Sequence, residues 1–384
     1  RSEVTANGVI IPHVLMWRGG FADNSVHSPW AQQHSVHFDG SNNKLVEKTA
    51  KDAKNGPFSE TGNYTFGGIE DNFFAGVALP IDSGSMEVRT YSDDVKMPGE
   101  SDPQKYAGVG FASGGANRIS FFAGPKDSDL LKQINPKLDK LIDWGYFGII
   151  AKPLFVFLKW IHDHWTFNYG WAIVLITIII NTLLFPFRLT QLKSSRKMQA
   201  LQPQIKALND KYKGISMSDP RKAKQNQEMM ALYKEAGVNP VGGCLPMLLQ
   251  LPFLYAFYRV LAIAFVLHGA TWLWVTDLSQ PETIVIHILP IFVVVTQFLM
   301  QKMTPAAGMD PNQQKMMLFM PLLFGFMFYS LPSGLVLYYL TSNIVNILQQ
   351  LLINRLMPNP APAGAPAAAP ALAAKAPVRK SLKK

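Results

Sequence analysis

WAIVLITIIINTLLFPFRLT, residues 171–190, is the stretch that decides what kind of protein this is. Its length and apolar composition suit a helix inside a bilayer, whose hydrocarbon core is about 30 Å thick. One primary amide, Asn181, lies near the middle. In hydrocarbon an amide loses its water partners, at a cost of roughly a few kcal/mol unless other groups replace them. The stretch therefore predicts a membrane helix and raises the question of what Asn181 faces.

The chain of 384 residues has two parts of different composition. Residues 1–140 are polar and carry 17 acidic and 14 basic residues, without a long apolar run. Residues 141–384 carry 9 acidic and 22 basic residues between apolar segments, so this part contributes +13 and residues 1–140 contribute −3 to the net charge of +10. The single cysteine, Cys244, excludes an intramolecular disulfide. This composition predicts a polar domain followed by a membrane domain.

Residues 1–136 are expected to form a mainly-β domain, an antiparallel sandwich. Short apolar or aromatic runs bounded by Gly, Pro, Asn and Asp are typical of its strands, and here they are NYTFGG, NFFAGVALPI, MEVRTY and RISFFAG. Because Arg1 is not a natural start, we expect the domain to be incomplete at its N-terminus. The sequence has no His/Cys/Asp cluster and no nucleophile motif, so we expect no metal, cofactor or catalytic residue.

Residues 137–166 are predicted to contain an amphipathic helix in the membrane interface. Lys152, Lys159 and Asp163 are seven and four residues apart, so at about 100° per residue they share one helix face. Most of the apolar side chains lie elsewhere, which favours a helix lying on the membrane. A tilted span with snorkelling lysines is the alternative.

Residues 167–356 are predicted to form a core of five transmembrane helices. The apolar segments are 168–186, 241–265, 283–301, 316–331 and 333–354. Residues 187–240 hold eleven Lys/Arg and the chain after 354 holds six, whereas the loop 266–282 holds none. By the positive-inside rule, the basic insert and the tail are cytoplasmic and the β-domain is outside.

The polar insert, residues 191–236, has the composition of a helical hairpin. We expect methionines of this hairpin and of the next cytoplasmic turn to bind varied apolar segments of substrates. Ordinary packing is the alternative. These methionines are Met198, Met229, Met230, Met303 and Met316. Residues 357–384 are Pro/Ala-rich and predicted to be disordered. The basic end of this tail could contact ribosomal RNA or anionic lipid through Lys375, Arg379, Lys380, Lys383 and Lys384.

The five spans contain no Asp or Glu, which argues against a proton- or sodium-coupled transporter. Thr177 and Asn181 are four residues apart on one helix face, and Gln250 could lie at a comparable depth in the next span. These groups could form an interhelical hydrogen bond, or they could line a hydrated cavity open to the cytoplasm. The residues alone leave both readings open.

Three runs resemble the YidC/Oxa/Alb membrane protein insertases: KEAGVNPVGGCLPMLLQLPFLYAFY, DPNQQKMMLFMP and PSGLVLYYLTSNIVNILQQ. The β-domain followed by KPLFVFLKWIH is similar to the bacterial YidC branch. The resemblance implies a periplasmic β-domain, a place in the bacterial inner membrane, and a polar intramembrane groove open to lipid and cytoplasm. It implies nascent membrane proteins as substrates, with lipids, the ribosome and the Sec translocon as partners and with no chemical step.

The family usually has an arginine in the groove, and alignment of FPFRLTQLKSSRKMQ with its pattern puts Asn181 at that position. Arg188 lies seven residues later and is not its equivalent. The groove threonine and tyrosine of the family are matched by Thr177 and Tyr339, so the resemblance implies a groove at Thr177, Asn181, Gln250 and Tyr339. An assembly scaffold without translocating activity, or a small-solute channel or transporter, is the alternative.

Overall fold

The computed structural model describes residues 1–18, 20–21, 33–81, 85–96, 103–113, 117–212, 214, 219–237, 245–303 and 311–356. The chain forms two compact units. The first consists of residues 1–182, 249–297 and 321–345, and the second of residues 183–248, 298–320 and 346–384.

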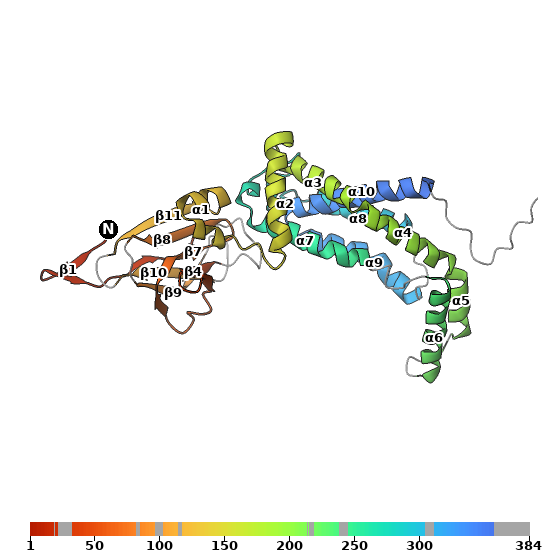
Figure 1. The fold of residues 1–384 in the computed structure, drawn as a ribbon, viewed down its shortest axis with the longest axis horizontal. Helices are drawn as coiled ribbons and strands as arrows, with labels where there is room; N and C mark the ends of the chain where they lie inside the picture. Colours follow the sequence, from red (N-terminus) through yellow and green to blue (C-terminus); the bar gives the residue numbers. More distant parts are fainter. Residues whose placement is uncertain are drawn as a thin grey trace, which may run out of the picture. The chain divides into compact units, whose positions relative to one another are not determined.

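The first unit begins with antiparallel β-sheets, which confirms the mainly-β prediction for this region (Figure 1). One sheet has the strand order β3-β10-β9-β6, another has the order β11-β8-β7-β4-β5, and β1 pairs with β2. The strands are β1 Val4–Ala6, β2 Val9–Ile11, β3 Leu15–Trp17, β4 His34–Asp39, β5 Lys44–Lys48, β6 Phe58–Gly62, β7 Tyr64–Glu70, β8 Phe74–Pro80, β9 Met86–Val95, β10 Gln104–Ala112 and β11 Ile119–Pro125.

The five-stranded sheet is buried on both faces. On one side Phe66 of β7 packs with Leu131 and Leu138 of the helical segment that follows the sheets. On the other side Ile69 of the same strand packs with Val109 of the four-stranded sheet. Side chains alternate across a strand, so β7 contributes to both cores. The helical segment is therefore a third layer of the β-region.

That segment consists of α1 (Ser128–Ile134) and the 3-10 helix η1 (Pro136–Leu141). The Asp127 carboxylate accepts hydrogen bonds from two backbone N–H groups at the start of α1, as a helix N-cap does. Just before it, Lys126 is buried and donates to Glu70 at 3.1 Å. Burial raises the pKa of the Glu70 carboxyl to about 7, although Lys126 opposes the shift.

The chain then turns sharply between two helices. α2 (Gly148–Ile161) continues into a π-helical turn, His162–Thr166, and α3 (Tyr169–Leu183) follows at an angle of 113°. Phe167 between them has φ 51°, a left-handed conformation that ends the helix. On α2, Lys159 donates to Asp129 of α1 at 2.5 Å and Lys152 donates to Asp139 of η1 at 3.2 Å. The two lysines thus tie α2 to the helical layer of the β-region.

The remaining apolar helices are α7 (Leu245–Ile263), α8 (Ile288–Met303), α9 (Pro311–Phe328) and α10 (Ser333–Leu356). A Cβ on Gly334 would lie 2.9 Å from Leu261 and 3.4 Å from Ile173, so the start of α10 approaches the end of α7 and the first half of α3 closely. α7 therefore runs opposite to α3 and α10. His287, just before α8, stacks on Tyr329, just after α9, at 3.6 Å, so α8 and α9 are also antiparallel.

Among the described helices, α10 alone is both long and apolar enough to cross a membrane by itself. α2 and α3 would count as a second span only if the bent pair acted as one. Shorter apolar helices cover residues 251–263, 288–303 and 318–328. The five segments expected from the sequence fall on α3, α7, α8, α9 and α10.

In the second unit, α4 (Phe185–Ala200) is followed by α5 (Gln202–Lys211) and α6 (Pro220–Glu235). Pro203 near the start of α5 cannot continue the hydrogen bonding of α4, which accounts for the break at Leu201. α5 and α6 pack through a small apolar core of Leu201, Ile205, Met198, Met229, Leu232, Tyr233 and Ala236. Residues 213, 215–218 and the tail 357–384 lie outside the described residues.

We predict that Lys126→Met destabilises the chain in a pH-dependent way. Removing one partner of a buried ion pair costs about 3–5 kcal/mol, and we expect this loss at pH 8, where Glu70 is charged. The folded-state pKa of Glu70 already lies above its ordinary 4.5, so the folded state is favoured as the pH falls through about 7. The loss should therefore be smaller at pH 5.5. Thermal unfolding of the purified chain in detergent at both pH values measures it, with the exposed Lys140→Met as control; equal losses at both pH values would contradict the prediction.

Candidate functional site

Asn181 lies in the last third of α3 and is partly exposed. Its Nδ2 donates to the Thr177 carbonyl, one turn earlier, at 2.8 Å. Its Oδ1 accepts a hydrogen bond at 3.2 Å from the hydroxyl of Ser342 on α10. The opening question thus has a structural answer, because the amide faces a polar side chain of a neighbouring helix.

Thr177, expected to share that role, is fully buried. Its hydroxyl donates to the Ile173 carbonyl of its own helix at 2.6 Å. A threonine that bonds to the carbonyl four residues earlier satisfies its own donor. The structure therefore brings Thr177 next to Asn181 without directing its hydroxyl proton toward another helix.

Tyr339 of α10 is at the centre of a second set of polar contacts. Gln297 of α8 donates through Nε2 to the Tyr339 hydroxyl at 3.2 Å. Nearby, Asn343 donates to the Thr296 hydroxyl at 3.2 Å. The Gln297 Oε1 atom is buried, and the described residues offer it no hydrogen-bond donor. A buried acceptor without a hydrogen bond destabilises the folded protein by about 1–3 kcal/mol. The position of this oxygen therefore indicates a site where a donor from outside the described residues can bind.

These residues share one face of α10. At about 100° per residue, Tyr339, Ser342 and Asn343 lie within roughly a quarter of the helix circumference. α3 contacts one edge of this face and α8 contacts the other. We call this set the polar stripe: Asn181, Thr296, Gln297, Tyr339, Ser342 and Asn343.

Sequence reasoning gave no role to Thr296 or Gln297. The available signal was the pair of glutamines at 297 and 301, four residues apart in an otherwise apolar segment. Gln301 has a buried Oε1 without a donor among the described residues, as Gln297 does. Amides repeated at helical spacing inside a predicted span indicate a polar face.

The other predicted site residues lie away from the polar stripe or outside the part of the chain that the structure describes. Gln250 is on α7, but its side chain is not among those the structure describes, and the same holds for Met316 on α9. Met198 of α4 and Met229 of α6 pack against the cluster of Leu201 and Ile205, whereas Met230 is 58% exposed and Met303 is partly buried. The basic tail residues Lys375, Arg379, Lys380, Lys383 and Lys384 lie outside the described residues.

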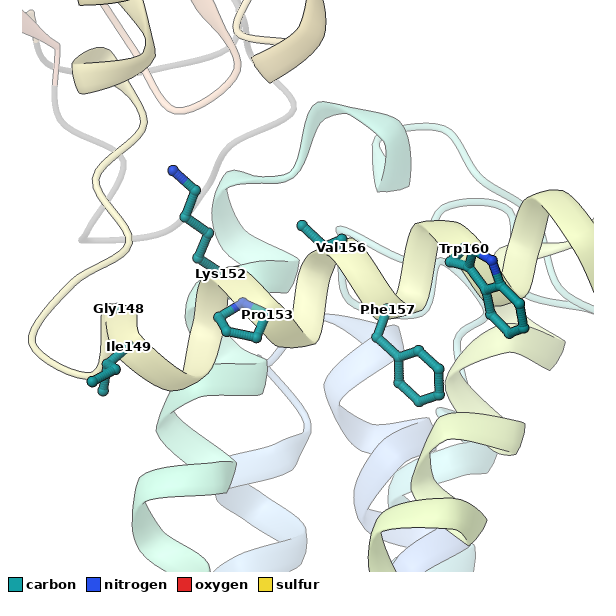
Figure 2. A pocket seen from close by; sticks show the side chains of 7 residues that line it. All are labelled: Gly148, Ile149, Lys152, Pro153, Val156, Phe157 and Trp160. Carbon is teal, nitrogen blue, oxygen red and sulfur yellow. The ribbon is translucent and has the colours of Figure 1, made fainter.

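The outward side of α2 is an exposed apolar face (Figure 2). A shallow hollow on it is lined by Gly148, Ile149, Lys152, Pro153, Val156, Phe157 and Trp160. Ile149 is 87% exposed, and Figure 2 shows Phe157 and Lys152 pointing to opposite sides of the helix. The opposite side of α2 is buried in the helical core through Ala151 and Leu158. α2 therefore has the faces that an interfacial helix needs.

Within the described residues, no group of three or more His, Cys, Asp or Glu side chains could hold a metal ion. The polar stripe consists of neutral amides and hydroxyls. Its chemistry is therefore hydrogen bonding, with no charged group among its members.

Two family models match the chain. The model described as "60Kd inner membrane protein" matches residues 160–360, and the model described as "YidC periplasmic domain" matches residues 26–157. The first match includes every residue of the polar stripe, and the second ends within α2. The chain therefore belongs to the 60Kd inner membrane protein family, in the branch with a YidC periplasmic domain.

Similar proteins carry the name "Membrane protein insertase YidC". The protein from Maridesulfovibrio salexigens is 39% identical over 328 residues, and that from Geobacter sulfurreducens is 40% identical over 316 residues. These matches cover 82% and 81% of this chain, but 58% and 57% of the relatives. The chain thus spans little more than half the length of these relatives.

Two further comparisons differ in coverage. The Wolinella succinogenes protein of the same name is 44% identical over 239 residues, which is 62% of this chain and 43% of the relative. A solved structure titled "Active YidC insertase crystal structure with the first transmembrane domain resolved" matches 90% of this chain and 82% of that chain, at 24% identity. Its TM-score of 0.43 is too low for a comparison of how the elements are arranged.

We predict that Asn181 and Ser342 are energetically coupled. Interhelical hydrogen bonds in membrane proteins contribute about 0.6 kcal/mol on average, so a double-mutant cycle of Asn181→Ala and Ser342→Ala should give a coupling energy near that value. The measurement is the unfolding free energy of the purified variants in detergent. Ser330→Ala, at an exposed serine between α9 and α10, is the control partner for Asn181→Ala and should give no coupling. A coupling energy no larger than the control value would contradict the hydrogen bond.

Proposed function

We propose that this chain inserts nascent membrane proteins into the bacterial inner membrane and helps them fold there. The observation that carries the proposal is the polar stripe, where three apolar helices bring amides and hydroxyls to one face of α10. The relatives named "Membrane protein insertase YidC" support it. In this proposal the chain catalyses no chemical step and needs no cofactor or small-molecule substrate.

The physical task is to move polar segments through hydrocarbon. Each backbone group without a hydrogen-bond partner costs several kcal/mol there. The stripe supplies donors and acceptors inside the bundle. Gln297 Oε1, which has no donor among the described residues, can accept from a passing N–H group. A hydrated stripe that reaches partway across the bilayer shortens the dry part of the path.

A neutral stripe suits substrates of varied charge. In the family pattern Asn181 occupies the position of an arginine, and an amide both donates and accepts whereas a guanidinium only donates. We propose that Asn181 acts through hydrogen bonding and hydration rather than by attracting acidic segments. Gln250 and Thr177 would extend the polar path from the neighbouring helices.

For the topology we propose five spans, α3, α7, α8, α9 and α10, with the β-domain in the periplasm and the C-terminus in the cytoplasm. The antiparallel course of α7 relative to α3 and α10 and the basic insert support this orientation. The short apolar helices would need flanking residues or local thinning of the bilayer. α2 would lie in the outer interface, with Ile149 and Phe157 toward the lipid.

We further propose that α5, α6 and the exposed Met230 receive substrates on the cytoplasmic side. The basic tail would assist ribosome docking, and the Sec translocon would be a second partner. An assembly scaffold would hold membrane helices without translocating any segment, and a solute channel would conduct. Reconstitution of the purified chain distinguishes these functions, since only an insertase brings a single-span substrate across.

We predict that the insertion activity of proteoliposomes follows the polarity of position 181. Asn181→Gln should keep nearly full activity because it preserves the amide. Asn181→Leu should reduce insertion severalfold, most for substrates with polar translocated segments, because the unmatched backbone groups then cross a drier path. Asn181→Arg should leave folding and insertion intact, because a hydrated stripe can solvate the charge. In a dry helix interface the same arginine would cost at least about 2.5 kcal/mol of insertion free energy.

The matched control is Thr182→Leu, which adds an apolar side chain to the exposed neighbouring position of α3. Protection of the translocated segment from protease measures insertion, and thermal unfolding of the same variants measures folding. If leucine at 181 keeps full activity while arginine unfolds the protein, Asn181 is a packing residue and the proposed role fails.

We predict that single cysteines in a Cys244-free background label according to the proposed topology. Cysteines at Ser85 in the β-domain and at Thr283 before α8 should react with an impermeant maleimide from the periplasmic side. One at Lys224 of α6 should react only after the inner face is opened. All three positions are exposed in the structure. Labelling of positions 85 and 224 from the same side would overturn the orientation.

A further inference from the structure

Arg188 of α4 is a partly buried arginine with an unusual set of partners. Its Nη1 donates to Asn346 Oδ1 of α10, and its Nη2 donates to the Asn346 backbone carbonyl at 3.3 Å. Its Nε is buried, and the described part of the chain offers that atom no acceptor. A guanidinium has five N–H donors, so Asn346 fixes the group while others remain available.

Both acceptors are neutral, so the positive charge of Arg188 is not compensated by Asn346. Neither α4 nor α10 contains an aspartate or glutamate. Among the described residues no carboxylate pairs with Arg188. A partly buried charge of this kind is costly, and the cost falls when an anion from outside the chain binds. The arrangement orients a guanidinium without neutralising it, as a binding site for an anion requires.

The surroundings of Arg188 indicate which anion fits. Leu183 and Phe187 are 74% and 67% exposed, so large apolar side chains face outward beside the arginine. Lys193 and Lys197 are exposed further along α4. Exposed apolar residues followed by exposed basic residues along one segment match the order of acyl chain and headgroup at a membrane surface.

A second contact repeats the pattern two turns later, where Arg196 donates to Asn354 at 2.7 Å. α4 thus has two arginines bonded to α10 amides and two exposed lysines, without an acidic residue. This adds positive potential beside Arg188.

We infer that Arg188, oriented by Asn346, binds the phosphodiester of an anionic phospholipid whose acyl chains contact Leu183 and Phe187. The site requires only that α4 lies at a membrane surface, and it is independent of whether the polar stripe translocates substrates. Guanidinium groups bind phosphate through charge-assisted, often paired, hydrogen bonds, which suits a group held in one orientation.

The test is a lipid titration of the purified full chain in a neutral detergent, with thermal unfolding as the readout. The probes are dioleoylphosphatidylglycerol, dioleoylphosphatidylcholine and inorganic phosphate. A ligand that binds only the folded state raises the unfolding temperature with concentration. We expect the anionic lipid to raise it, the zwitterionic lipid to raise it less, and inorganic phosphate to leave it unchanged because that ion lacks the acyl contact.

The decisive variant is Asn346→Asp, which places a carboxylate beside Arg188 and supplies the counter-ion from within. Without lipid, this variant should unfold at or above the unfolding temperature of the parent. Its apparent affinity for phosphatidylglycerol should fall roughly tenfold or more, because the carboxylate takes the place of the lipid phosphate in strong hydrogen bonds to the guanidinium. Arg188→Gln should lose as much. The control Lys197→Gln removes one exposed charge of the same helix and should change the affinity less than about threefold.

Three outcomes overturn the inference. In the first, Asn346→Asp binds phosphatidylglycerol as the parent does. In the second, Lys197→Gln loses as much affinity as Arg188→Gln, which indicates unspecific attraction. In the third, inorganic phosphate stabilises as well as the lipid does. If the first outcome is accompanied by impaired insertion of acidic substrates, the arginine serves the substrate instead of a lipid. Loss of lipid binding with normal insertion supports the lipid site and leaves the proposed function intact.

Discussion

The rest of this structure depends on one constraint. Every polar group inside a low-dielectric helix bundle needs a hydrogen-bond partner. α10 meets it for several helices at once, because its amides and hydroxyls lie on one face between α3 and α8. Where a partner is available the polar group is fixed, as Asn181 is by Ser342. At Gln297 Oε1 the part of the chain that the structure describes offers no donor, so this buried acceptor is left without its usual compensation.

Much of the fold could be predicted from local patterns. Short apolar or aromatic runs bounded by turn residues indicated the mainly-β region, and long apolar runs indicated the positions of α3, α7, α8, α9 and α10. Asn181 could be singled out because an amide in such a run is costly. Its partner could not, because Ser342 is 161 residues away and the register between two helices is not encoded in the periodicity of either. The family resemblance, more than the residue pattern, suggested Tyr339.

Other features depended on contacts that a single helix pattern cannot reveal. The face shared by Lys152 and Lys159 suggested a helix turned toward lipid headgroups, yet both lysines donate to carboxylates of the neighbouring helical layer. A charged face predicts only that a helix side is polar, and the identity of the partner depends on tertiary structure. Gln297 was overlooked although Gln301 lies one helical turn away, because the spacing of the two glutamines indicates a polar face but does not identify Tyr339 as the partner.

The helical layer of α1 and η1 has a consequence for how this protein can be divided. One side of the layer completes the core of the five-stranded sheet through Leu131 and Leu138, and its carboxylates receive the α2 lysines. A truncation that removes the sheets but keeps this layer exposes leucines that normally meet Phe66. A truncation that removes the layer as well leaves Lys152 and Lys159 of α2 without the carboxylates they bind. The layer of α1 and η1 therefore contributes both to the core of the five-stranded sheet and to the ion pairs of α2. In evolution, the β-region could be replaced by that of another protein only together with this layer.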